Sequence, residues 1–366
     1  MKINKDIKVA LVCDWLTGIG GAELVVLELH KMFPNAPIYT SQYEPKKIDW
    51  FKDADVRTTW LDIIPSSLKK FLPVLRAYSF SKLNLSEYDL VISASGSEAK
   101  GIKTGNKTIH ICYCHSPTHY YWVRYDSYLI DPGFGKFNWL ARISLKMLVG
   151  PMRRWDFTAA QKPNYLLANS SYIKGNILKY YKRNSTIIYP PVDMVKFKDN
   201  LQKISRSGYV VVGRQTPYKK IDLAVKACTK LNLNLTVIGD GPENKNLKAI
   251  AGPTIKFLGQ VDDSTKNNYL RSAEAFIFPG VDDFGIAAVE ALSNGTPVIA
   301  YKDGGALDYI NDHTGIFFSE QTTKSLCEAL VSFKAGNFNN LEINEFPKKF
   351  STENFQKNIY KFIESL

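Results

Sequence analysis

The sequence contains few cysteines and no long hydrophobic run. Its 366 residues include 5 cysteines, mostly in expected strands or helices, which favours buried reduced thiols over a disulfide framework. Cys112-x-Cys114-His115 has no second Cys/His pair at zinc spacing, so a core strand is the better interpretation. No apolar stretch reaches the ~20 residues of a membrane-spanning helix, and Met1–Lys8 lacks the pattern of a signal peptide. These absences predict a cytoplasmic chain.

Acidic residues are scarce relative to basic ones. The chain has 35 Asp and Glu against 47 Lys and Arg, a formal net charge of +12. Such an excess favours a polyanionic partner: nucleic acid, an anionic membrane or a phosphorylated substrate. No helix-turn-helix, RNP-like or zinc-finger pattern is present, so we expect no nucleic-acid partner.

Two signatures of other enzyme classes fail. The run from Gly18 to Glu23 begins like the dinucleotide fingerprint G-x-G-x-x-G, but Glu23 occupies the third glycine position and would prevent close helix–strand packing. A hydride-transfer dehydrogenase is therefore disfavoured. Asp53-Ala54-Asp55 has the D-x-D form of metal-using transferases, yet it lies in a charged run before a strand, which favours a solvated loop.

Short apolar runs alternate with helical patterns along the chain, which predicts two α/β domains. Pro190-Pro191 hold the chain extended between them, and the composition changes after Lys198. We expect an N-terminal domain over residues 1–189 and a C-terminal domain over 190–350, followed by a last helix over 351–366. The expected strands are Ile7–Cys13, Pro37–Ser41, Val56–Trp60, Asp89–Ala94, Thr108–Cys114, Tyr165–Asn169, Thr186–Tyr189, Tyr209–Gly213, Leu235–Gly239, Ile255–Leu258, Ala275–Pro279, Pro297–Tyr301 and Gly315–Phe318.

The stretch from Phe278 to Tyr301 reads as strand, loop, helix and strand. Its loop contains Asp282, Asp283 and Gly285, and Glu290 lies in the otherwise apolar helix that follows. Ligands of α/β sheets bind beyond the carboxyl ends of the strands, where a helix N-terminus favours an anion. Carboxylates among apolar neighbours usually bind hydroxyls or cap backbone groups, so this stretch predicts a ligand site.

Three other loops follow expected strands. Arg214 and Lys219 come after the first strand of the second half and would neutralise a diphosphate without a metal, although a solvated basic loop is the alternative. Gly20-Gly21 separates the first strand from its helix, as in phosphate-binding loops, although a simple tight turn is the alternative. His115 follows another strand beside hydroxyl and aromatic residues, where a histidine is either structural or functional.

These motifs together resemble retaining glycosyltransferases of family 4. The resemblance extends from Gly20-Gly21 to the last helix and rests on CYCHSP, GRQTPYKKIDLA, GDGPE, FPGVDDFGIAAVEA and GGALDYI, in the family's order. Asp282 and Glu290 have the spacing of the family's E-x7-E signature, with Asp in place of the first Glu. The resemblance implies an α/β GT-B fold, in which two Rossmann-like domains face each other across a cleft and the last helix packs back on the first domain.

The resemblance also implies roles for individual residues. Arg214 and Lys219 would hold the leaving diphosphate, Glu290 the ribose, and Asp282 and His115 the transferred sugar. The donor site would further include Gly20, Gly21, Gly239, Phe284, Gly285 and Ile286. The anomeric configuration would be retained by front-face substitution, without a metal ion or other cofactor.

The implied activity is transfer of a hexose, most simply mannose from GDP-mannose, to a lipid-linked saccharide in cell-surface polysaccharide synthesis. A UDP-sugar donor is one alternative, and a non-catalytic nucleotide-sugar-binding protein is another. The partners would be a nucleotide sugar, a lipid-linked glycan and the anionic inner face of the plasma membrane.

Two basic amphipathic stretches are candidates for the membrane contact. Residues 64–83 and 136–161 mix Leu, Phe and Trp with cations, a composition typical of interfacial helices. For the first stretch, an ordinary helix packed on the sheet and broken at Pro73 is an equal alternative. The cations expected to bind lipid are Lys69, Lys70, Arg76, Arg153 and Arg154.

Overall fold

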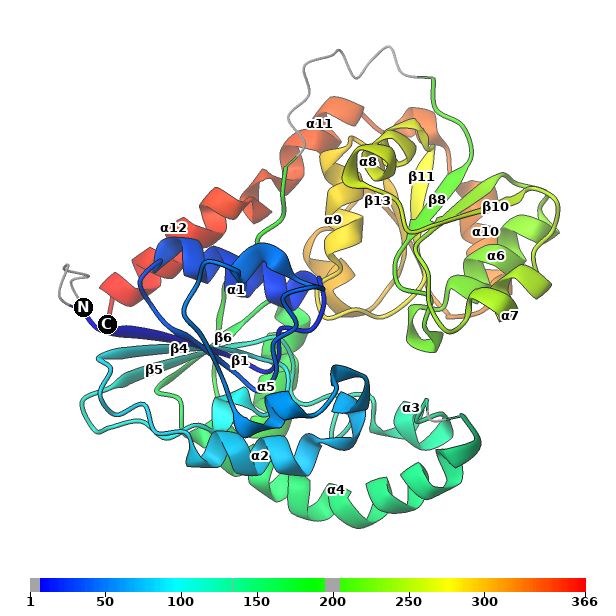
Figure 1. Cartoon of the computed structure of the whole chain (residues 1–366). Helices are drawn as coiled ribbons and strands as arrows, with labels where there is room; N and C mark the ends of the chain where they lie inside the picture. Colours follow the sequence, from blue (N-terminus) through cyan, green and yellow to red (C-terminus); the bar gives the residue numbers. More distant parts are fainter. Residues whose placement is uncertain (1–6, 134, 195–204) are drawn as a thin grey trace. The chain divides into compact units, whose positions relative to one another are not determined.

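A computed structural model describes residues 7–133, 135–194 and 205–366 (Figure 1). The chain divides into two compact units: unit 1 comprises Met1–Pro191 and Phe355–Leu366, and unit 2 comprises Val192–Asn354. The division falls at the Pro190-Pro191 pair, whereas the composition change after Lys198 lies outside the described residues.

Unit 1 contains one parallel sheet in the order β3-β2-β1-β4-β5-β6-β7. Its central strands are mostly apolar and almost entirely buried, as expected for a parallel sheet covered on both faces. The strands are β1 (Val9–Cys13), β2 (Ile38–Thr40), β3 (Val56–Thr58), β4 (Leu90–Ser95), β5 (Ile109–Cys114), β6 (Tyr165–Ala168) and β7 (Thr186–Ile187). The helices are α1 (Gly21–Met32), α2 (Pro73–Lys82), α3 (Tyr125–Ile130), α4 (Asn138–Gln161), α5 (Ser171–Tyr181) and α12 (Thr352–Glu364).

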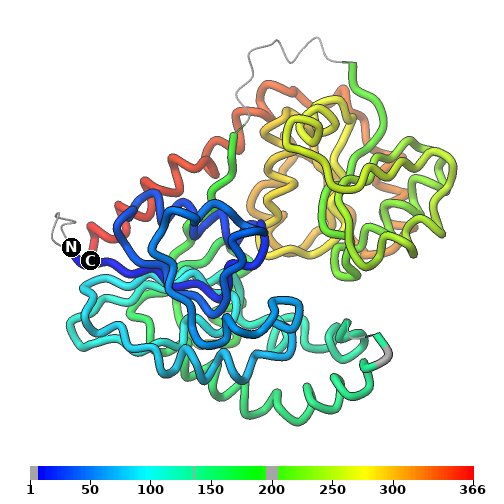
Figure 2. Tube along the Cα trace, viewed as in Figure 1, coloured from blue at the N-terminus to red at the C-terminus, as the bar shows by residue number. Residues whose placement is uncertain are grey.

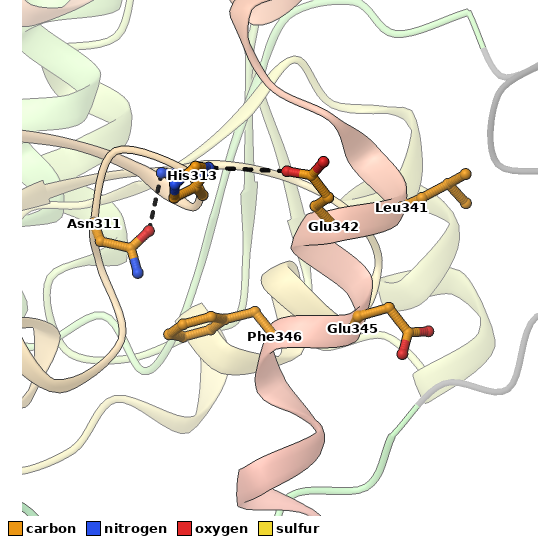
Figure 3. Close-up of a pocket in the computed structure, with 6 residues that line it drawn as sticks. All are labelled: Asn311, His313, Leu341, Glu342, Glu345 and Phe346. Atoms are coloured by element: carbon orange, nitrogen blue, oxygen red, sulfur yellow. Dashed lines mark hydrogen bonds and ion pairs between the residues drawn. The ribbon is translucent and has the colours of Figure 1, made fainter.

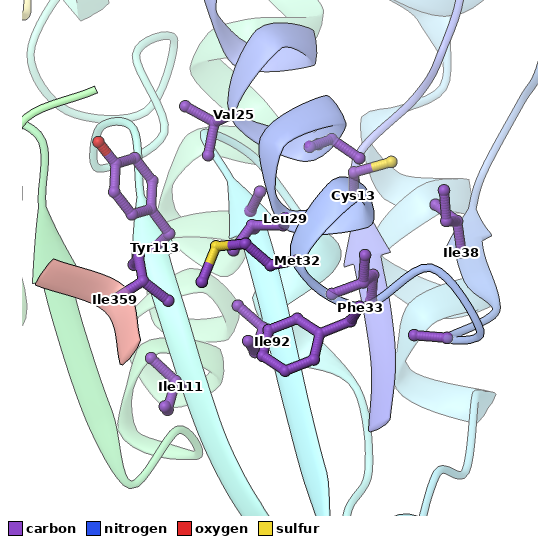
Figure 4. Packing of buried hydrophobic residues seen from close by; sticks show 14 of the residues in the cluster. Cys13, Val25, Leu29, Met32, Phe33, Ile38, Ile92, Ile111, Tyr113 and Ile359 are labelled. Atoms are coloured by element: carbon purple, nitrogen blue, oxygen red, sulfur yellow. The ribbon is translucent and has the colours of Figure 1, made fainter. Parts of the chain in front are cut away.

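The last helix completes the core of unit 1. Phe355, Ile359 and Ile363 repeat every four residues, so they share one face of α12, and all three are buried in one cluster. Figure 4 shows Ile359 in this cluster with Leu29 and Tyr113. Polar contacts reinforce this packing, since Gln356 Nε2 donates to Glu28 Oε2 at 2.8 Å and Tyr360 Oη to the Met32 carbonyl at 3.1 Å. Figure 2 shows α12, in red, running alongside α1, in dark blue.

Unit 2 repeats the arrangement with the sheet order β10-β9-β8-β11-β12-β13, again parallel. The strands are β8 (Tyr209–Val212), β9 (Leu235–Ile238), β10 (Ile255–Gly259), β11 (Ala275–Phe278), β12 (Val298–Tyr301) and β13 (Gly315–Phe318). The helices are α6 (Ile221–Lys230), α7 (Asn244–Ala249), α8 (Asp263–Ser272), α9 (Ile286–Ser293), α10 (Thr323–Ser332) and α11 (Asn340–Glu345). Helices α6 and α10 pack their buried faces on one side of this sheet.

Each sheet reverses its strand order at one place. In unit 1 the chain winds outward from β1 in one direction and from β4 in the other, and in unit 2 the same happens between β8 and β11. Loops that leave the carboxyl ends of two such strands diverge to opposite faces, which leaves a crevice where ligands of doubly wound sheets bind. The fold therefore points to the loops after β1 and β4 in unit 1, and to those after β8 and β11 in unit 2.

The two basic amphipathic stretches are helical, but one of their cations is buried. Residues 66–71 form a 3-10 segment and Pro73 begins α2, while α4 covers most of the second stretch. Arg76 is 2% exposed and forms an ion pair with Glu98, with Nε and Oε2 2.8 Å apart. The expectation that Arg76 contacts lipid is therefore wrong. Within the described residues, no helix is long and apolar enough to cross a membrane.

The contribution of α12 to unit 1 can be measured separately from unit 2. We expect Ile359→Ala to lower the unfolding free energy of unit 1 by about 2–5 kcal/mol, because it removes a buried side chain and leaves a cavity. All six tryptophans lie in unit 1, so tryptophan fluorescence during urea unfolding reports on that unit alone. Asn358→Ala, at the neighbouring exposed position, is the control. Equal urea midpoints for the two variants would contradict this role of α12.

Candidate functional site

In unit 2 the loops after β8 and β11 meet through an ion pair. Lys219 ends a 3-10 turn after β8, and its Nζ binds Asp282 Oδ2 in the loop after β11. The backbones also approach closely, because a Cβ on Gly280 would lie 2.8 Å from the Lys219 carbonyl oxygen. Only glycine fits that position without displacing the Lys219 turn. The close approach brings a cation and a carboxylate together at the switch point of the sheet.

The loop after β9 packs against the same region. Gly239 has a φ of +112°, and a Cβ there would collide with the Gly213 carbonyl oxygen. Buried Gln215 fixes the contact, since its Nε2 donates to the Gly239 carbonyl at 2.7 Å and its backbone N–H to the Asp240 carbonyl at 2.9 Å. Gly239 thus lies beside the loop that carries Arg214 and Lys219. The side chain of Arg214 itself is exposed.

Aromatic packing supports the loop that leads into α9. Gly285 is the N-terminal cap of α9 and Ile286 its first residue. Phe284 is 3% exposed, and its ring packs 5.6 Å from the ring of Tyr309 and 5.3 Å from that of Phe350, measured between centroids. Tyr309 Oη also donates to the Phe284 carbonyl at 2.8 Å. The Phe284 side chain therefore belongs to the core and shapes the loop, while a donor contact of Phe284 stays a prediction.

Glu290 forms an ion pair that sequence reasoning did not anticipate. Lys266 Nζ, on α8, lies 2.9 Å from Glu290 Oε1 and 2.9 Å from Asp263 Oδ1. Burial raises the pKa of Glu290 above its ordinary value, Lys266 acts in the opposite direction, and Asp263 and Asp193 raise it further. The lysine therefore helps to keep a half-buried carboxylate ionised, and so able to accept hydrogen bonds from ligand hydroxyls. The only sequence signal was a lysine within the α8 pattern, which does not indicate its partner.

In unit 1 the loops after β1 and β4 are joined by Asp14, and the loop after β5 packs against the second of them. Its Oδ2 accepts from the Gly96 N–H at 2.8 Å, and its Oδ1 from the Ala99 N–H at 2.8 Å and from Ser95 Oγ at 3.1 Å. His115, directly after β5, is half-buried beside this loop, since a Cβ on Gly96 would lie 3.5 Å from the His115 Cβ. Sequence reasoning passed over Asp14, although an acid at the end of a first strand is a recognisable signal.

Buried ion pairs support these loops from within unit 1. Besides Arg76–Glu98, Lys100 Nζ lies 2.7 Å from Asp156 Oδ1, with both side chains fully buried. Asp156 Oδ2 also accepts from Tyr181 Oη and from Trp122 Nε1, each at 2.7 Å. Such a network holds the segments that carry Lys100, Trp122 and Asp156 in a fixed arrangement. The sequence did not indicate it, because the partners come from different elements.

Gly20 and Gly21 lie at the N-terminus of α1, as expected, and an acid accompanies them. Gly20 is the cap residue and Gly21 the first helical residue. Burial raises the pKa of Glu23, in the first turn of the helix, to about 7, while the nearby charge of Lys69 lowers it. The start of α1 can thus exchange a proton near neutral pH.

Two other features lie outside this arrangement. Asp55 forms an exposed ion pair with Arg57, with Oδ2 and Nη2 2.7 Å apart, in the loop that was interpreted as solvated. A surface hollow in unit 2 is lined by Asn311, His313, Leu341, Glu342, Glu345 and Phe346 (Figure 3). The hollow contains none of the residues expected to bind a donor.

The Lys266–Glu290 pair gives a direct titration test. Lys266→Met removes the charge that favours the ionised carboxylate, so the already raised pKa of Glu290 should rise further. Side-chain carboxyl ¹³C NMR of glutamate-labelled protein over a pH series would measure it. Lys226→Met, which breaks the exposed Lys226–Asp222 pair on α6, is the control and should leave Glu290 unchanged. A Glu290 titration that is the same in all three proteins would contradict the coupling.

Comparison with known proteins places these loops in context. Residues 196–353 match the family model described as Glycosyl transferases group 1. An uncharacterized glycosyltransferase of Methanocaldococcus jannaschii is 25% identical over 57% of this chain, and the match spans 61% of that relative. The alpha-1,3/1,6-mannosyltransferase alg-2 of Neurospora crassa is 24% identical, over 84% of this chain and 78% of its own length. A phosphatidyl-myo-inositol mannosyltransferase of Mycolicibacterium smegmatis is 36% identical, over 30% of this chain and 32% of its own length.

Among solved structures, HepE of Anabaena in complex with UDP superposes with a TM-score of 0.70. The superposition covers 98% of this chain and all of HepE, at 16% sequence identity. The two parallel sheets and this likeness confirm the expected fold class. The chain therefore has the GT-B fold, and its residues 196–353 are similar to the glycosyl transferases group 1 model.

Proposed function

We propose that the protein is a retaining glycosyltransferase that transfers mannose from GDP-mannose to a lipid-linked saccharide at the inner face of the plasma membrane. The single observation that carries the proposal is the arrangement at the switch point of unit 2. There Lys219 and Asp282 meet between the loops after β8 and β11, and Glu290 follows on α9. Cations suit a diphosphate and carboxylates suit sugar hydroxyls, so the arrangement has the chemistry to bind a nucleotide sugar.

Each residue has a defined task in this proposal. Lys219 and Arg214 bind the diphosphate and stabilise the negative charge that develops on it as the glycosidic bond breaks. Glu290, kept ionised by Lys266, accepts hydrogen bonds from the ribose. Asp282 and His115 bind hydroxyls of the transferred sugar, and the acceptor hydroxyl replaces the diphosphate on the same face of the ring. The cations perform the charge neutralisation, so the reaction needs no metal ion.

Binding of the diphosphate changes the partner of Lys219. Without a ligand its ammonium is bound to Asp282, so the incoming phosphate shares or takes over that contact. Asp282 is then released to accept from a sugar hydroxyl. The pair thus holds both side chains in position before the donor arrives, which lowers the cost of organising the site.

Mannose and GDP are implied only by the family resemblance, and mannose is further supported by the mannosyltransferases among the relatives. A UDP-sugar is the second candidate, because HepE was solved with UDP. A non-catalytic nucleotide-sugar-binding protein is the third, because Asp282 is one methylene shorter than the usual Glu.

The decisive experiment offers GDP-mannose and several UDP-sugars in parallel, with a lipid-linked saccharide as acceptor. We expect turnover with GDP-mannose and an α-linked product, identified by NMR of the anomeric centre, with undiminished activity in EDTA. A β-linked product, or turnover with UDP-sugars alone, would reject the assignment. Donor binding without transfer or hydrolysis would favour the non-catalytic alternative. Loss of turnover in EDTA that Mg²⁺ restores would reject the metal-independent mechanism and direct attention to Asp53 and Asp55.

The two cations can be tested together. Arg214→Ala/Lys219→Ala leaves the charge on the departing diphosphate uncompensated, so turnover should fall by at least about a hundredfold. Lys226→Ala/Lys230→Ala removes the same charge from the exposed face of α6 and serves as the control. Activity within a factor of two of the wild type in the first variant would show that these cations do not hold the leaving group.

A further inference from the structure

The first half of α4 has an apolar face that the described residues of unit 1 leave exposed. All residues from Asn138 to Pro151, which the structure describes throughout, are exposed or half-buried. Trp139, Ile143 and Met147 follow one another at intervals of four, so they form one stripe, and Leu140 borders it. Their exposed fractions are 61%, 48%, 73% and 48%. Large apolar side chains gathered on one exposed face of a helix mark an interaction surface.

This apolar stripe lies on the side of α4 opposite to the face that packs against the rest of unit 1. The buried residues of α4 come later and include Met152, Asp156 and Ala159. Asp156 follows Met147 by nine positions, which at ~100° per residue places the two on opposite sides of the helix. An ordinary surface helix turns its polar face outward. The first half of α4 instead turns an apolar face outward, so its sequence is matched to an apolar surrounding.

A second exposed apolar segment lies beside α4. Lys70 Nζ donates to the Gly133 carbonyl at 3.4 Å, just before α4, and Trp155 Nε1 donates to Ser81 Oγ at 3.2 Å. These bonds hold the 3-10 segment 66–71 and α2 against α4. Phe71 in the 3-10 segment and Tyr78 in α2 have exposed fractions of 63% and 57%. Figure 1 shows α2 and α4 running next to each other. The apolar surface therefore extends over two adjoining helical segments.

The two segments that form this surface carry only positive charges, although exposed Asp131, which accepts from Asn138 Nδ2 at 2.9 Å, lies beside the start of α4. Residues 63–83 and 132–155 contain no Asp or Glu. Lys146 and Arg154 are exposed on α4, with Arg154 on the same side of the helix as Ile143 and Met147. A helix with an apolar face that carries tryptophan, together with cations and no acids, has the composition of helices that lie in the headgroup region of a bilayer. A protein partner would not require cations alone along both segments.

We propose that the apolar face of α4, together with the adjoining segment 66–82, is the surface through which unit 1 docks on an anionic lipid bilayer. The inference rests on the membrane part of the proposed function and replaces the lipid contacts expected for Arg76 and Arg153. Arg76 is buried in its ion pair. Arg153 donates from Nε to the Tyr121 carbonyl at 2.6 Å and stacks on Trp122 and Tyr125. Trp139, Ile143 and Met147 enter the acyl boundary, while Lys146 and Arg154 contact the headgroups.

Co-sedimentation of the full-length protein with vesicles tests this surface. The vesicles are phosphatidylcholine alone or phosphatidylcholine with phosphatidylglycerol, at low and high salt. Ile143→Glu/Met147→Glu should abolish binding to the anionic vesicles. Lys146→Gln/Arg154→Gln should weaken it about 30-fold, because each cation near an anionic surface contributes on the order of a fivefold to tenfold gain in binding.

Matched controls lie in unit 2. Val331→Glu/Leu341→Glu makes the same change at exposed apolar positions, and Lys230→Gln/Lys334→Gln removes two exposed cations there. Neither should alter vesicle binding. Binding that survives Ile143→Glu/Met147→Glu, or that is indifferent to lipid charge and salt, would overturn the proposal. A sedimentation coefficient of Ile143→Glu/Met147→Glu that differs from that of the wild type in the absence of vesicles would also overturn it. That result would identify the face as an interface between two copies of the chain.

The same variants separate this inference from the proposed function. Each is assayed for GDP-mannose turnover with a short, water-soluble acceptor, whose delivery does not need the membrane. Unchanged turnover together with lost vesicle binding is the expected result. Vesicle binding that depends on α4 in a protein without transferase activity would reject the function and leave the docking surface standing. Transferase activity in an Ile143→Glu/Met147→Glu protein that still binds vesicles would reject the docking surface and leave the function standing.

Discussion

The ion pair between Lys219 and Asp282 is the interaction on which the candidate site depends. It exists because the loops after β8 and β11 approach to backbone contact at Gly280, where any side chain would force them apart. Other residues of unit 2 that were expected to bind a donor lie on loops packed around this contact. Gly239 packs its loop against the Lys219 side, while Phe284 and Tyr309 hold the Asp282 side and the start of α9. Tight backbone packing thus positions the charges, and the charges provide the chemistry.

Unit 1 also holds the loops at the carboxyl ends of its strands in place, but through buried polar contacts instead of close packing at glycines. Its loops at the carboxyl ends of β1 and β4 are joined by the carboxylate of Asp14 and supported by the buried pairs Arg76–Glu98 and Lys100–Asp156. A buried pair is costly to break, since removal of one partner typically destabilises a protein by about 3–5 kcal/mol. Rigid loops in unit 1 and glycine-packed loops in unit 2 are both ways to preorganise polar groups before a ligand arrives.

The fold could be predicted from the sequence because the strands of a parallel sheet are short apolar runs with clear breaks. Every expected strand is present, with ends that differ by a few residues at most. The candidate site was predictable only where chemistry is local, as in the spacing of Asp282 and Glu290 along one loop and helix. Lys266 and Glu290 are 24 positions apart on different helices, and Arg76 and Glu98 are 22 apart, so no local pattern reveals either pair. The same limit explains Phe284, whose burial depends on Tyr309 and Phe350.

The discontinuity of unit 1 has a consequence for how the protein is made. Phe355, Ile359 and Ile363 fill the core between α1 and the sheet, yet the ribosome adds them only after all of unit 2. Unit 1 is therefore almost completely translated while the part of its apolar core that α12 covers is still exposed. The sequence of unit 2, in contrast, is complete before α12 is added. During synthesis the face that these three side chains cover stays exposed until the last helix has been added, so unit 1 can complete its core only after unit 2 has been translated.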